Sequence, residues 1–174
     1  MLYGTPATLR RDARRNRTAI VEAAGAVLSG TGSAALMAEV ARRAGIGQAT
    51  LYRHFPDRYA LTAAVIDHHL AALATCARDG APLRPLVHEA LRRQVTMRPL
   101  AELAHGLDPA TRRRFEQRLA AVFAVPVRRA LEGGTVRPDL TPADILLVFG
   151  MVHEVGAAAA GRLIEFTLDG LFRA

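Results

Sequence analysis

The sequence predicts an all-α protein, with a three-helix unit that contains a helix-turn-helix at the N-terminus and a second helical unit behind it. Alanine and leucine dominate, only 5% of the residues are aromatic, and long alternating β-branched runs are absent, a composition that favours helices over strands. Apolar residues make up 51% of the 174 residues, enough to bury a core in one ordinary domain or two small ones.

The first helix is expected over residues 10–29, because apolar residues from Ile20 to Leu28 recur at helical spacing before Gly30 and Gly32 end the pattern. A second helix follows over residues 37–44, where Met37, Val40, Ala41 and Ala44 form one stripe. Gly45 then stands where helices commonly stop.

Ile46 is expected to enter the core between these helices, and Gly47 allows a tight turn before a short third helix over residues 48–55. A fourth helix, which would connect the two units, is predicted from Pro56 to Ala77. The segment 78–82 then breaks the helical pattern with a glycine and a proline.

Shorter helical patterns fill the second half. They are expected over residues 85–96, 100–104, 108–131, 141–160 and from Gly161 to Phe172. Pro126 lies inside one of these patterns and predicts a kink or a split there, and Gly161 predicts a bend before the last helix.

The third helix has two chemically distinct sides. Gln48, Thr50 and Arg53 lie on one side, and Leu51 and Phe55 on the other. Apolar residues that anchor a helix opposite hydrogen-bonding residues are typical of a helix that enters a DNA groove. A helical hairpin that never touches DNA has the same layout, so the pattern alone leaves both interpretations open.

The segment that follows, LYRHFPDRYAL, places Tyr52, His54 and Arg58 around Phe55. With it, roughly residues 10–66 resemble the tetracycline-repressor (TetR/AcrR) family of bacterial transcription regulators. The resemblance implies that Gln48, Ala49 and Thr50 reach base edges and that Tyr52 and His54 contact phosphates. Family members usually carry a lysine where Arg58 stands.

The chemistry of these side chains agrees with the resemblance. The amide of Gln48 can pair with adenine, and the methyl and hydroxyl of Thr50 suit thymine. Arg53 and Arg58 add positive charge that raises affinity without recognising sequence. Tyr52 could instead only pack the hairpin and His54 only cap the helix, and neither role excludes a phosphate contact.

Leu36 departs from the family pattern, in which a serine or threonine usually opens the second helix. Leucine cannot cap a helix, so Ser33 is expected to serve if the helix starts early. Ala38 also replaces a commonly polar residue. Both changes put backbone contacts from the second helix in doubt, but not the fold.

The charge distribution supports a DNA-binding N-terminal unit. The net charge is +7 and every basic residue is arginine; nine of the 23 arginines but only four acidic residues lie within residues 1–58, a net +5 there. The cluster Arg10 to Arg17 suits an arm over phosphates, although a solvated tail would look the same. A single cysteine, Cys76, fits a reducing cytoplasm, and neither a signal peptide nor a membrane span is expected.

The resemblance implies a DNA-binding domain over residues 1–56 and an effector-binding and dimerisation domain over 57–174. A homodimer is expected because the small-sided segment 155–161 and the apolar last helix suit a helix–helix interface, and because one helix-turn-helix contacts only a half-site. The expected ligand is an apolar small molecule. Its candidate contacts, for which core packing is the competing role, are Met97, His105, Phe115, Phe123, Met151 and His153.

The predicted function is therefore a ligand-responsive repressor that binds a palindromic operator as a dimer. The alternatives are a small helical enzyme and a helical adaptor that does not bind DNA. Histidines such as His68, His69 and His153 lack the spacing of a known metal or acid–base motif, and phosphate-binding glycine motifs are missing. No cofactor, metal or membrane partner is expected.

Overall fold

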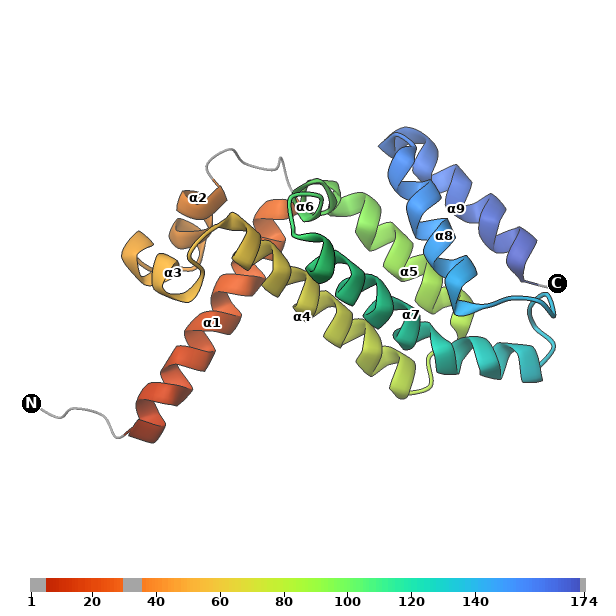
Figure 1. Ribbon diagram of the computed structural model, residues 1–174, viewed down its shortest axis with the longest axis horizontal. Coiled ribbons are helices and arrows are strands. Elements are labelled where there is room, and N and C mark those ends of the chain that lie inside the picture. Colours follow the sequence, from red (N-terminus) through yellow and green to blue (C-terminus); the bar gives the residue numbers. More distant parts are fainter. Residues whose placement is uncertain (1–5, 30–35, 173–174) are drawn as a thin grey trace, which may run out of the picture.

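The computed structural model describes residues 6–29 and 36–172, with side chains from residue 15 onward. Within these ranges the chain forms nine α-helices and one isolated bridge between Val136 and Phe172. The all-α prediction is confirmed. Figure 1 shows an elongated molecule in which α1 to α3 form one end and α8 and α9 the other.

The N-terminal end contains α1 (Pro6–Leu28), α2 (Leu36–Arg43) and α3 (Gln48–His54). Gly45 adopts a positive φ of 67°, which relieves the strain that a side chain would cause after α2. Ile46 is partly buried against the same core as α2, as expected.

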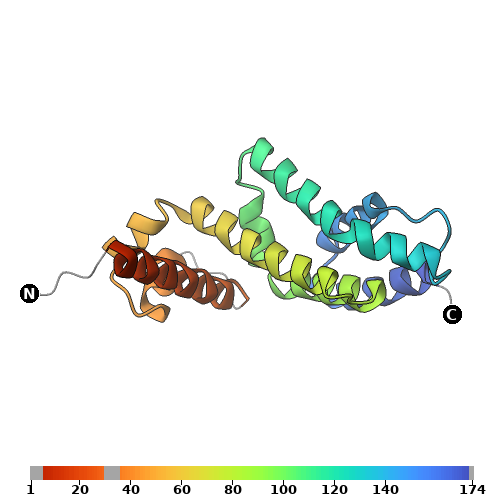
Figure 2. The same cartoon turned by 90° about the horizontal axis from the view of Figure 1, so that it is seen from below.

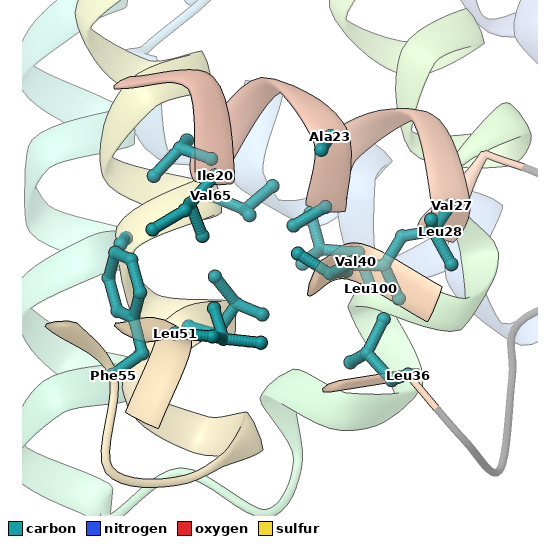
Figure 3. Packing of buried hydrophobic residues seen from close by; sticks show 14 of the residues in the cluster. Ile20, Ala23, Val27, Leu28, Leu36, Val40, Leu51, Phe55, Val65 and Leu100 are labelled. Carbon is teal, nitrogen blue, oxygen red and sulfur yellow. The ribbon is translucent and has the colours of Figure 1, made fainter. Parts of the chain in front are cut away.

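A single apolar cluster, the N-terminal core, holds these helices together. Figure 3 shows Ile20 and Leu28 of α1 facing Val40 of α2 and Leu51 of α3. Val65 of α4 (Arg58–Arg78) and Leu100 of α6 (Arg98–Ala104) complete the same cluster. The helix-turn-helix is thus packed directly on helices of the second half.

The C-terminal core is formed by α5 (Leu83–Thr96), α7 (Pro109–Glu132), α8 (Pro142–Glu154) and α9 (Ala157–Leu171). Figure 2 shows α4 running from the helix-turn-helix end into this unit, beside α7. By length and composition α4 could cross a membrane, but its Leu61 and Val65 are buried in the N-terminal core and its Ala77 in the C-terminal core. The division at residue 56 stays a prediction, because α4 contributes to both cores.

Several helix boundaries differ from the sequence-based expectations. The first helix begins at Pro6 rather than near Arg10. Of the kink or split predicted at Pro126, the split does not occur, because α7 continues through this buried proline.

The break before the last helix lies at Val155 and Gly156, not at Gly161, which is inside α9. Arg98 stabilises this break by donating hydrogen bonds to the carbonyl oxygens of His153 and Val155, at 2.9 and 2.7 Å. These are carbonyl groups that a helix end leaves without an internal partner. The sequence could not show this contact, because Arg98 lies more than fifty residues away.

Candidate DNA-binding surface and ligand cavity

The outer side of α3 presents a compact set of polar side chains. Gln48, Ala49, Tyr52 and Arg53 are exposed, whereas Leu51 on the opposite side is fully buried. The exposed fraction of Tyr52 is 47%, so nearly half of this residue is open to solvent and is not packed inside the hairpin. The predicted division of α3 into an anchored and an outward side is present in the structure.

Thr50 and Arg53 are joined on this surface. The guanidinium of Arg53 donates a hydrogen bond to the Thr50 hydroxyl at 2.9 Å, one helical turn away. The contact places the positive charge of Arg53 beside the Thr50 hydroxyl, which the sequence predicts to contact bases. Thr50 is partly buried, so it lies at the edge of the exposed side.

His54 and Arg58 lie at the turn from α3 into α4. His54 is partly buried, with its ring centroid 6.5 Å from that of the buried Phe55. Arg58 is exposed at the first position of α4. Asp57 caps this helix by accepting a hydrogen bond from the Ala60 amide at 2.8 Å, which holds Arg58 at the rim of the same surface.

Two features of α1 and α2 border this surface. Arg17 lies with its guanidinium carbon 4.8 Å from the centre of the Phe55 ring, which ties α1 to the turn after α3. In α2, Arg42 donates to both carboxylate oxygens of Glu39 at 2.8 and 2.6 Å. These hydrogen bonds, with the charge of Arg42, hold the pKa of Glu39 below its usual value.

Leu36 is the first residue of α2, at the position where the family usually has a capping serine or threonine. In this structure its side chain packs in the core. Its side chain is 4% exposed and belongs to the N-terminal core, close to Leu28 in Figure 3. Leu36 therefore contributes apolar burial at the start of α2, where family members usually have a side chain that caps the helix. Ser33, the proposed substitute cap, lies outside the described residues, as do the side chains of Arg10, Arg11 and Arg14.

A cavity of about 340 Å³ lies in the second half of the protein, among α4, α5, α6, α7 and α8. Most of its walls are apolar. They include Ile66, Leu73 and Leu86, with Leu119 of α7 and Phe149 of α8. Met97, a residue proposed from sequence as a ligand contact, also lines it.

The other five proposed contacts do not line this cavity. Phe115 packs with Leu70 and Leu107, Phe123 is fully buried in the C-terminal core, and Met151 is 49% exposed on α8. His105 and His153 stack on one another with ring centroids 4.8 Å apart. Helical periodicity groups such residues correctly on faces, but it does not show which face turns toward a cavity.

Two polar residues of the cavity wall were not identified from sequence as ligand contacts. These are His69 of α4 and Gln94 of α5. Burial is the main cause that lowers the pKa of His69 to about 4, and the charges of Arg93 and His68 lower it further. Arg93 lies beside His69 at 3.4 Å and donates to Glu89 at 3.2 Å. Among the residues that the structure describes, no three His, Cys, Asp or Glu side chains converge as metal ligands.

Comparison with known proteins gives consistent results. Residues 20–65 match the model for bacterial regulatory proteins of the tetR family. The chain is 31% identical over 155 residues to the HTH-type transcriptional repressor LfrR of Mycolicibacterium smegmatis, an alignment that covers 84% of this chain and 79% of that protein.

Solved structures share the whole architecture. A TetR transcription regulatory protein from Mycobacterium vanbaalenii is 29% identical with a TM-score of 0.73, covering 95% of this chain and 99% of that one. A TetR transcriptional regulator from Streptomyces coelicolor is 27% identical with a TM-score of 0.65, covering 91% and 99%. The similarity thus extends through both cores and is not confined to the helix-turn-helix.

Proposed function

Because this chain belongs to the tetR family of bacterial regulatory proteins and is a DNA-binding transcriptional regulator, we propose that it is a ligand-responsive repressor that acts as a homodimer in the cytoplasm. In this proposal the dimer binds a palindromic operator and blocks transcription until a small molecule binds. The M. smegmatis relative is a transcriptional repressor, which supports repression over activation. An enzyme is not favoured, because the matched proteins are regulators.

The exposed side of α3 carries the DNA-binding part of the proposal. Gln48, Ala49 and Thr50 at its start would contact base edges, and Tyr52 and His54 would donate to phosphates. Arg53 and Arg58 would add salt-dependent affinity. The buried Leu51 and Phe55 hold this helix on the N-terminal core, so its outward side keeps a fixed direction.

An exposed apolar face on α8 and α9 supports the homodimer. Leu147 is 65% exposed and Met151 49%, one turn apart on α8, and Phe166 on α9 is 60% exposed. The exposed alanines Ala157 to Ala159 would let a second helix approach closely. Exposed large apolar side chains are typical of an interaction surface, and a two-fold pairing through α8 and α9 would supply two copies of α3 for two half-sites.

A ligand in the cavity could influence α1 through shared residues. Met97 lines the cavity and is also part of the N-terminal core. His69 lines it too, and its Nε2 lies 3.8 Å from where a Cβ on Gly25 of α1 would stand. Met97 and His69 could each adopt two positions, and a ligand that binds one arrangement more tightly than the other would favour it. The angle between the helix-turn-helix end and the second half of the protein would then shift.

The DNA-binding part of the proposal is tested by operator selection followed by substitution on α3. DNA bound by the purified protein is selected and sequenced, and affinity for the selected fragment is measured for the double variant Tyr52→Ala/Arg53→Ala. The variant should lose at least tenfold in affinity, because a phosphate donor and a charge are removed from each subunit. Arg128→Ala, which removes one exposed charge on α7, a helix of the C-terminal core, is the control and should bind almost normally. Unchanged affinity of the double variant would refute the assignment of α3.

The homodimer is tested by native mass measurement. Leu147→Glu/Phe166→Glu should yield monomers, because carboxylates would be buried at the proposed interface. Val125→Glu changes another exposed apolar residue, on α7 (45% exposed), and should leave the dimer intact. A wild-type protein that is monomeric at micromolar concentration would contradict this part of the proposal.

A further inference from the structure

The cavity among α4 to α8 holds a polar atom that the protein itself leaves without a partner. Gln94 projects from α5 and donates a hydrogen bond from its Nε2 to the backbone oxygen of Phe149 on α8, at 2.9 Å. Because a carbonyl oxygen only accepts, this bond determines which end of the amide is the nitrogen. The other end, Oε1, is buried and has no hydrogen-bond partner.

Such atoms are rare in this protein. Among the described residues, only Gln94 Oε1 and His69 Nε2 are buried side-chain polar atoms without a partner. Both residues line the same cavity. A buried acceptor that has lost water without gaining a donor costs free energy, so its retention here calls for a partner that the chain does not supply.

The two unpartnered atoms face different parts of the protein. His69 Nε2 lies toward Gly25 of α1, in the cleft that α1 forms with α4 and α5. Gln94 lines the cavity and is not among the residues of that cleft. Of the two residues, Gln94 is therefore the one that belongs to this cavity alone, and because its Oε1 is buried, a ligand reaches that atom only when the side chains that cover it move aside.

The charges around the cavity oppose an ionic ligand. Glu89 and Arg93 are the charged residues of its lining, and they pair with one another at 3.2 Å. His69 is neutral at pH 7, because burial has lowered its pKa to about 4. The cavity therefore offers apolar walls, one unpartnered acceptor and a compensated ion pair.

We propose that Gln94 determines ligand specificity in this cavity, and that its Oε1 accepts a hydrogen bond from an N–H or O–H group of a neutral, mainly apolar molecule. The inference rests on the proposed ligand response. A volume of about 340 Å³ is near the lower end of small-molecule sites. The ligand class is thus a compact aromatic or alicyclic alcohol, phenol or amine in its uncharged form.

The test compares two probes that differ in the donor. Binding of 2-naphthol and of 2-methoxynaphthalene to the wild-type dimer is measured by calorimetry at pH 7. The naphthol should bind about tenfold more tightly, because the ether cannot satisfy Gln94 Oε1. Equal affinities, a preference for the ether, or no saturable binding of either probe would overturn the inference, and this comparison needs no variant.

A substitution of Gln94 tests whether this residue causes the preference for the naphthol. In Gln94→Met the preference for the naphthol should disappear, with little change in affinity for the ether. Gln117→Met, at an exposed position on α7, is the matched control and should keep the wild-type preference. A preference that survives in Gln94→Met would place the acceptor elsewhere and refute the assignment.

Operator affinity of the same samples separates this inference from the proposed function. Intact operator binding without a probe preference refutes the role of Gln94 alone. A probe preference without any change in operator affinity on saturation supports the role of Gln94 and refutes the ligand response. Absence of operator binding in the protein without probe refutes the proposed function itself.

Discussion

Protonation of His69 should make the stability of this protein fall steeply in mild acid. Its ring is partly buried between α1, α4 and α5, beside Arg93, and its pKa is lowered from 6.5 to about 4. Between these values the unfolded chain binds a proton that the folded chain does not. The free energy of unfolding therefore has its full value above pH 6.5 and decreases as the pH falls toward 4.

The magnitude follows from the difference between the two pKa values. With about 1.4 kcal/mol per unit, the loss from this one group is about 2 kcal/mol at pH 5 and about 3 kcal/mol at pH 4, relative to pH 8. These are upper values, because solvent reaches part of the ring. A loss of this size is a substantial fraction of the stability of an ordinary domain.

The assay is urea denaturation followed by circular dichroism at intervals from pH 8 to pH 4. The variant His69→Leu fits the apolar wall and cannot titrate, so its stability should decline less than that of the wild type, by at most about 2 kcal/mol at pH 5. His68→Leu removes an exposed neighbouring histidine and should keep most of the wild-type decline. Parallel curves for wild type and His69→Leu would show that burial of His69 does not control this transition.

Four substitutions test the packing. Gly25→Ala should raise the free energy of unfolding by about 0.5–1 kcal/mol in urea titrations, because alanine is favoured over glycine within a helix. The added Cβ would meet His69 Nε2 at 3.8 Å and Met97 Cε at 4.0 Å, which are ordinary contact distances. A loss of stability would show that α1 packs more tightly on His69 and Met97 than these distances indicate. Gly106→Ala should lower Tm, because a Cβ at that position overlaps the ring of Tyr59; in a Tyr59→Ala background the penalty should vanish, and an additive double variant would contradict this contact. Leu51→Ala should cost about 2–5 kcal/mol in unfolding free energy, since Leu51 is fully buried in the N-terminal core; a cost below 1 kcal/mol would show that α3 is loosely packed. Thr141→Ala should cost about 1 kcal/mol by removing the capping box with Asp144 at the start of α8, whereas an unchanged midpoint would mean that the cap contributes nothing.

Local patterns in the sequence predicted the DNA-binding end well. The apolar stripe of Val40 and Ala41, the glycine after α2 and the buried Leu51 and Phe55 are all near one another in the chain, so helical periodicity and turn chemistry determine them. Leu36 was the exception. The sequence indicates only that a helix cap is missing there, whereas in the structure Leu36 fills the N-terminal core with residues of α1. No local sequence rule indicates such a contact between separate helices.

The helices of the second half and an apolar ligand site among them were predicted, but most residues that line the cavity were not. Amphipathic patterns located most helices, yet Met151 was placed at a ligand site and is exposed, and Gln94 was not considered. The role proposed for Gln94 depends on its hydrogen bond to Phe149, which is 55 residues away. Pairings of this kind arise from the angles at which helices cross, and single-sequence periodicity carries no information about those angles.

The proposed function requires that two copies of α3 bind the phosphate backbone and the base edges of a palindromic operator. Its most direct measurement is the affinity of the wild-type protein for the selected operator fragment as a function of salt concentration. One dimer should bind each palindrome, and log affinity should fall steeply and linearly with log salt, by about one order for each phosphate neutralised per tenfold increase in salt. Affinity that does not change with salt, or binding of a half-site as tight as binding of the full palindrome, would contradict it.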